Sequence, residues 1–156
     1  MSVQERVEIY DLFADYGNCL DEDRLEEWVD LFSADCTYKI IPRDNYDLNL
    51  PLTLMLCENQ NMLRDRIVSL REANQFSIHR DRHLITNIKI TPSMKSEFSV
   101  TANYAVFQAD AEGSGSLFSF GFYDTKIVFI NEKPKFYYMD VVVDNWAIPH
   151  MLSTPI

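Results

Sequence analysis

The spacing of apolar residues changes partway along the chain, and that change limits the folds it can adopt. In the first third, apolar residues recur at spacings of three, four and seven, the period of an amphipathic helix. From residue 82 onward, apolar and polar residues alternate, the period of a half-buried strand. Helices therefore precede a run of consecutive strands, and this order predicts an α+β fold that ends in an antiparallel meander.

Two short antiparallel helices are expected first, joined by the acidic residues 21–23. The second helix is expected to begin with a capping box, in which the side chains of Asp23 and Glu26 bind main-chain N–H groups. The expected apolar faces of the two helices consist of Val3, Val7, Tyr10, Phe13 and Leu20, and of Leu25, Trp28, Val29 and Phe32.

Further along, strands are expected at 36–43 and 53–58, a helix at 60–73, and strands at 82–90, 98–108, 117–130 and 136–144, with hairpin turns at 111–115 and 131–134. In the strand 82–90, one face is expected to carry Leu84, Ile88 and Ile90, and the other His83, Asn87 and Lys89. A sheet that curls around three helices makes a cone. Such a cone can enclose a pocket or present its outer face to a partner.

Length and charge narrow the classes of function. The 156 residues fit one domain, expected to span 1–156. The net charge of −10 argues against nucleic-acid and anionic membrane partners, since both require clustered Lys and Arg. No apolar run approaches the ~20 residues of a membrane-spanning helix. The first residues carry no secretory signal, so a cytoplasmic location is expected.

The residues give little support for metal or nucleophile chemistry. Cys19, Cys36 and Cys57 are widely spaced, which is typical of buried free thiols. His79 and His83 are four residues apart, a spacing that binds metal on one helical face, but they are expected in a loop that enters a strand. No nucleophile elbow and no glycine-rich phosphate loop occurs in the sequence.

Two parts of the sequence resemble known families. LDEDRLEEWVDLFSADCTY, at 20–38, is similar to the opening of the cone-shaped nuclear-transport-factor-like and SnoaL-like superfamily. NYD at 45–47, LPL at 50–52, MLRDRI at 62–67, LREAN at 70–74 and RDRHLI at 80–85 resemble the small (β) subunits of aromatic-ring-hydroxylating dioxygenases. Within these, the resemblance is closest to the terephthalate dioxygenase and salicylate hydroxylase branch, and it covers about residues 5–150.

The resemblance implies a multicomponent Rieske non-heme iron oxygenase that hydroxylates an aromatic ring, with a substituted aromatic acid as the expected substrate. The Rieske [2Fe–2S] centre and a mononuclear iron then belong to a large (α) subunit, and this chain holds no cofactor, no metal and no catalytic residue. It would form a homotrimer within an α3β3 assembly. A reductase, in some systems with a ferredoxin, would deliver electrons to the large subunit.

A run of arginines stands out in this acidic chain, and with the resemblance it indicates a subunit interface. Bidentate pairs with carboxylates of neighbouring subunits are expected there. The alternative is a solvated helix with local pairs to Asp65 and Glu72. The expected interface residues are Arg64, Arg66, Arg71, Arg80, Arg82 and His83.

An alternative function is a stand-alone SnoaL-like isomerase or dehydratase. Enzymes of that superfamily use Asp, His and Tyr inside the cone, and here Asp15 and Tyr16 lie on the first expected helix, while His79 or His83 precedes the sheet. A buried Asp–His pair can act as general base and acid. The opposing interpretation places Asp15 on a solvated helix face and Tyr16 in the core. Residues 146–152 form an apolar stretch that is expected to dock on this chain or on a neighbour.

Overall fold

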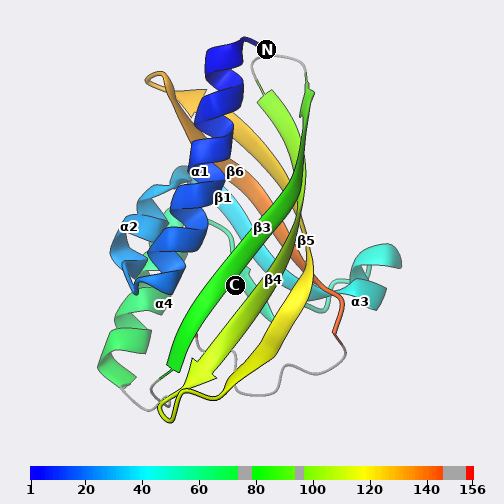
Figure 1. Cartoon of the computed structure of the whole chain (residues 1–156). Helices are drawn as coiled ribbons and strands as arrows, with labels where there is room; N and C mark the ends of the chain where they lie inside the picture. The colour runs from blue at the N-terminus through cyan, green and yellow to red at the C-terminus, as the bar shows by residue number, and fades with distance from the viewer. Residues whose placement is uncertain (74–78, 94–96, 146–153) are drawn as a thin grey trace.

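The computed structural model describes residues 1–73, 79–93, 97–145 and 154–156. A six-stranded sheet curls around a helical layer, so the expected α+β class is confirmed (Figure 1). Helices α1 (Val3–Asp21), α2 (Leu25–Asp30) and α4 (Gln60–Ala73) gather on one side of the sheet. None of the described helices is both long and apolar enough to cross a bilayer.

Helix α1 buries only part of the face expected, namely Phe13 and Leu20. Ser2 and Glu5 form a capping box at its start. Val3, Val7 and Tyr10, expected in the core, are exposed. The helix carries two neighbouring apolar stripes, and the stripe with the bulkier residues faces the sheet. The buried residues of that stripe include Ile9, Leu12, Phe13, Tyr16 and Leu20.

The capping box expected at the start of α2 is wrong. The N-cap residue is Arg24, and its side chain makes no capping hydrogen bond. Asp23 has a left-handed φ of 56°, and its carboxylate accepts a hydrogen bond from Arg71 at 2.6 Å. The ion pair with α4 therefore takes the carboxylate that the cap would need. The helix ends at Asp30, and Phe32 begins the first strand instead of continuing the helical face.

The sheet has the order β2-β1-β6-β5-β4-β3. Strands β3 to β6 form the expected antiparallel meander, whereas β1 pairs in parallel with β6. A two-residue turn with positive φ at Asn131 and Glu132 joins β5 to β6, and Gly113, with φ of 86°, lies in the turn before β5. The strand bounds are β1 (Phe32–Pro42), β2 (Met55–Cys57), β3 (His79–Pro92), β4 (Glu97–Asp110), β5 (Gly115–Ile130) and β6 (Lys133–Val143).

Strand β3 does not keep one alternation along its length. Asn87 has φ of 54°, and the pairing with β4 shifts between Thr86 and Lys89. Such a bulge adds one residue and exchanges the two faces beyond it. Leu84 therefore points outward, opposite to Ile88, so the expectation that they share a face is wrong. The segment from His79, expected as a loop, is already part of the strand.

The polar stretch expected after the first strand is a short helix, α3 (Arg43–Asp47). Arg43 lies one turn before Asp47 and donates to its carboxylate at 2.9 Å, and it also donates to Asp144 at 3.0 Å. The ring of Tyr46 packs edge-on against Phe122 of β5, so α3 reaches over the outer face of the sheet.

Tyrosine hydroxyl groups lie among the apolar side chains of the core. The rings of Tyr104 and Tyr123 stack with centroids 4.7 Å apart, and Tyr16 meets Tyr123 edge-on at 5.4 Å. Tyr16 and Tyr38 donate to the main-chain carbonyl oxygen of Ile156. Burial is the main cause that raises the pKa of all four phenols.

We expect alkaline pH to unfold the protein through these four tyrosines. Their folded pKa lies above the unfolded value of about 10, so the unfolded chain loses these protons first. The free energy of unfolding is then unaffected by them below about pH 10 and falls as the pH rises further. Phenolate absorbance recorded with far-UV circular dichroism should show the buried group ionising together with the loss of structure. Ionisation of all eight tyrosines in an intact fold would contradict this.

Candidate functional site

A buried pair of acidic and basic side chains joins the end of α1 to the edge strand β3. Nδ1 of His83 lies 2.6 Å from Oδ1 of Asp21, and the two side chains are 1% and 3% exposed. The main-chain N–H of His83 donates to both carboxylate oxygens at 3.0 Å. Arg82 lies 3.7 Å away from the same carboxylate. Asp21 therefore holds both the backbone and the ring of His83.

The position of Asp21 explains why it needs such a partner. It is the last residue of α1, where the helix dipole is negative and a carboxylate is unfavourable. The cationic and N–H groups of β3 offset that cost. The helix lies close to the strand at Gly17. A Cβ atom at this position would lie 3.4 Å from the Cβ atom of His83. A small residue at position 17 is therefore part of the site.

His83 also lines a cleft of about 320 Å³ between α1 and β3. A carboxylate only accepts hydrogen bonds, so the Nδ1 atom of His83 carries the proton that points to Asp21. The other ring nitrogen, Nε2, is buried and has no hydrogen-bond partner among the described residues. Its geometry suits a proton acceptor or an anchor for a small polar group. The cleft is lined by Tyr10, Phe13, Ala14, Gly17, Asn18, His83, Ile85 and Ile88.

The structure does not bring Asp15, Tyr16 and His79 together. Asp15 is exposed on α1. Tyr16 is fully buried, and its hydroxyl binds the main chain of Ile156. His79 lies 3.5 Å from Asp81 on the same strand. The acid–base pair that does form, Asp21 with His83, was missed because its members are 62 residues apart. The signal available in the sequence was an acidic residue at the C-terminal end of an expected helix, where a carboxylate needs a cationic or N–H partner.

The expected interface arginines fall into two groups. Arg64 donates to Asp30 at 2.8 Å, and Arg71 donates to Asp23 and Glu26, so these two tie α4 to the α1–α2 region. These two arginines therefore do not form the alternative local pairs with Asp65 and Glu72.

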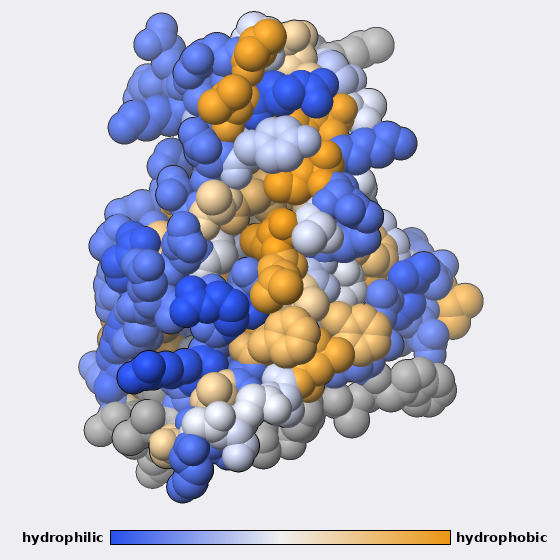
Figure 2. Space-filling model, viewed as in Figure 1, coloured by the Kyte–Doolittle hydropathy of each residue, from blue (hydrophilic) through white to orange (hydrophobic). Residues whose placement is uncertain are grey.

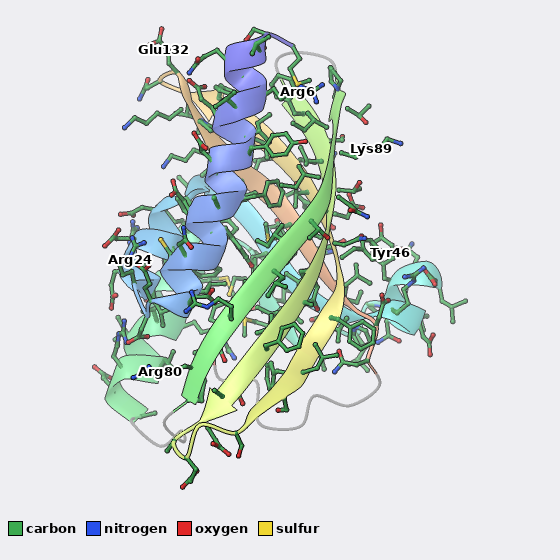
Figure 3. All side chains as sticks on the ribbon, in the orientation of Figure 1. Arg6, Arg24, Tyr46, Arg80, Lys89 and Glu132 are labelled. Carbon is green, nitrogen blue, oxygen red and sulfur yellow. The ribbon has the colours of Figure 1, made fainter. Side chains whose placement is uncertain are left out.

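The second group has weaker ties within the chain. Arg80 lies at the start of β3 (Figure 3) and forms no ion pair within the described ranges, and Arg82 is 70% exposed. Nε of Arg66 is buried without a partner among the described atoms. His83, also expected at an interface, has a buried side chain. Residues 146–152 lie outside the described residues, so the expectation for them is not tested.

The three thiols and the two neighbouring histidines of β3 lie in positions that do not favour metal binding. Cys19, Cys36 and Cys57 are buried and free, as expected, and burial raises the pKa of Cys36 to about 11. His79 and His83 are four residues apart on a strand, about 13 Å along it, which is too far for one metal ion. Within the described ranges, no group of three or more His, Cys, Asp or Glu is placed to hold a metal.

Comparison with known proteins gives a consistent result along nearly the whole chain. The SnoaL-like domain family matches residues 1–148. The small subunit of anthranilate 1,2-dioxygenase from Burkholderia cepacia is 38% identical over 149 residues, 96% of this chain and 92% of that one. The β2 subunit of the terephthalate 1,2-dioxygenase terminal oxygenase component from a Comamonas species is 29% identical over 143 residues, 92% of this chain and 93% of that one.

A solved structure shows that the similarity to dioxygenase small subunits holds in three dimensions. It is assigned to the β subunit of an aromatic-ring-hydroxylating dioxygenase from Novosphingobium aromaticivorans. It superimposes with a TM-score of 0.89 at 37% identity, and the match covers 99% of this chain and 100% of that one.

Replacing Asp21 tests whether the buried pair holds the fold together. Asp21→Asn removes the charge that accepts three hydrogen bonds, so we expect the free energy of unfolding to fall by about 3 kcal/mol. Asp15→Asn is the matched control, because it makes the same change at an exposed position of the same helix, with an expected effect below about 0.5 kcal/mol. Urea unfolding measures both. Equal stability of the two variants would show that the pair contributes nothing.

Proposed function

Because the chain belongs to the SnoaL-like domain family and, within it, to the small (β) subunits of aromatic-ring-hydroxylating dioxygenases, we propose that it is a non-catalytic assembly subunit. In this proposal it trimerises and joins large (α) subunits in an α3β3 complex. The Rieske [2Fe–2S] centre and the mononuclear iron lie in the large subunit. That subunit also receives electrons from the reductase or ferredoxin. The observation that carries the proposal is the 38% identity to a dioxygenase small subunit over 96% of the chain.

The described residues on the concave side of the sheet support a role without catalysis by this chain. They include buried aromatic rings, and the hydroxyls of Tyr16 and Tyr38 already donate to the main-chain carbonyl oxygen of Ile156. The contribution of this chain to the reaction would then be positioning. Holding the large subunits in a fixed arrangement keeps their iron centres at the distance that electron transfer requires, and small misplacements cost rate.

The names of the relatives support a class of substrate. One relative is named for anthranilate and another for terephthalate, and both compounds are carboxylated aromatic rings. We therefore propose a substituted aromatic acid as the substrate of the whole complex. The large subunit would bind it, and this chain would set the geometry of the assembly around it.

Co-expression with a Rieske-type large subunit tests the assembly role. The expected result is a hexamer by size-exclusion chromatography with light scattering, with iron found in the large subunit and in the complex. The small chain purified alone should contain no iron and should not hydroxylate an aromatic acid. Iron bound to the isolated chain, or turnover by it, would refute the proposal.

Arginine substitutions test which residues contact other subunits. Arg66→Ala and Arg82→Ala should weaken hexamer assembly about tenfold or more, because each removes a guanidinium that can pair with a carboxylate of another subunit. Arg64→Ala is the matched control, because its guanidinium already binds Asp30 within the chain, and assembly should not change. Dissociation constants and melting temperatures are measured together. A loss of stability with unchanged assembly in all three would contradict the interface role.

One observation favours a second candidate, a stand-alone isomerase or dehydratase. His83 lines the cleft, its Nε2 has no hydrogen-bond partner among the described residues, and Asp21 binds the other ring nitrogen. The isolated chain would then isomerise or dehydrate a small polar aromatic or polyketide-like compound, and His83→Gln would abolish this without unfolding the protein. If the isolated chain is inactive and His83→Gln only lowers stability, the pair is structural and this candidate is excluded.

A further inference from the structure

The outer face of the sheet carries large apolar side chains where solvent-facing strands normally carry polar ones. Leu84 is 46% exposed, Phe107 45%, Leu117 44% and Phe120 39%. Strand register brings them together, because Ala105 is opposite both Leu84 and Phe120, and Phe107 is opposite Leu117. Figure 2 shows hydrophobic side chains gathered over β3, β4 and β5. We call these four residues the outer-face patch.

Two arginines flank the outer-face patch. Arg80 and Arg82 point to the same side of β3 as Leu84, and Arg82 is directly opposite Phe107 in the register. Arg80 has no charged partner within the described ranges, and the contact of Arg82 with Asp21 is 3.7 Å long. An apolar centre with arginines at its rim is typical of a protein interface.

Helix α1 presents a second surface that remains exposed, and it has the opposite charge. Val3, Val7 and Tyr10 form an apolar stripe at spacings of four and three. Asp11 and Asp15, one turn apart on the same exposed side, make no hydrogen bond or ion pair with any described residue. We call this surface the α1 stripe.

The two surfaces match in spacing as well as in charge. Residues one helical turn apart, such as Asp11 and Asp15, are separated by about 6 Å. Residues two apart on a strand, such as Arg80 and Arg82, are separated by about 6.6 Å. Each pair of charges lies beside an apolar region. Contact between the surfaces would cover apolar area on both sides and pair two carboxylates with two guanidinium groups.

We propose that the α1 stripe of one copy packs on the outer-face patch of a second copy, with Asp11 and Asp15 paired to Arg80 and Arg82. The contact joins two different surfaces, so it is head-to-tail, and such contacts repeat until they close a ring. The number of copies in the ring rests on the proposed assembly function. The inference adds the two surfaces through which the copies contact each other. The occupant is a copy of this chain because both complementary surfaces lie on this one chain.

Charge reversal on either surface tests the contact. The sheet variant carries Arg80→Glu and Arg82→Glu, and the helix variant carries Asp11→Lys and Asp15→Lys. Each should weaken self-association about a hundredfold, because like charges then face each other. The control carries Glu112→Lys and Glu132→Lys, the same charge change as in the helix variant but on two hairpin turns, and it should associate like the wild type. Analytical ultracentrifugation measures association, and circular dichroism confirms folding.

Mixing the variants distinguishes a head-to-tail contact from other arrangements. An equimolar mixture of the sheet variant and the helix variant should associate again with the two variants in equal amounts, because the two unchanged surfaces pair with each other and so do the two reversed surfaces. A chain with all four substitutions should associate again, since both surfaces are then reversed. Failure of either result, or a wild-type chain that stays monomeric at its highest soluble concentration, overturns the proposal.

Binding of the large subunit separates this inference from the proposed function. If the sheet variant self-associates normally but no longer binds a large subunit, the outer-face patch docks the large subunit, and the inference fails while the proposed function stands. If the wild type self-associates as described but binds no Rieske-type large subunit, the proposed function fails and the inference stands.

Discussion

The docking of helix α1 along the edge strand β3 is the contact on which the rest of the structure depends. Asp21 accepts the main-chain N–H of His83, and the hydroxyl of Tyr10 donates to the carbonyl oxygen of Ile88. Side chains of the helix therefore use hydrogen-bonding groups that an edge strand would otherwise expose. The same contact places the buried face of α1 over the tyrosine-rich concave side of the sheet. The core and the sheet edge are thus stabilised by one helix.

This arrangement leaves the two sides of the sheet with different roles. The concave side carries buried aromatic rings and Ile156 among its described residues, so it stabilises the fold. On the convex side, α3 packs against Phe122 of β5, and large apolar side chains of β3 to β5 remain exposed (Figures 1 and 2). Relatives along nearly the whole chain are subunits of multicomponent oxygenases, and an exposed convex side fits a chain that works in an assembly.

The sequence predicts an element correctly where the spacing of apolar residues along that element determines which face is buried. The alternation of Phe98, Val100, Ala102, Tyr104 and Val106 gave β4 its buried face, and the meander followed from strands joined by short turns. The prediction fails where a distant residue changes a local preference. Asp23 does not cap α2 because Arg71 binds it, and Leu84 points outward because of the bulge at Asn87. The Asp21–His83 pair was beyond reach for the same reason, since only the folded chain brings its members together.

The protected edges have a consequence for the recognition of partners. One outer strand of the sheet is covered by α1, and the other, β2, has only three residues. Main-chain hydrogen bonds between the sheet edges of two proteins do not depend on the identity of the side chains. The covered edge and the short edge restrict such pairing, so contacts with partners are made by side chains. A few substitutions can alter such contacts without changing the fold. Two related chains in one cell can therefore evolve different contact residues. Each then assembles into its own complex, and the two complexes do not exchange subunits.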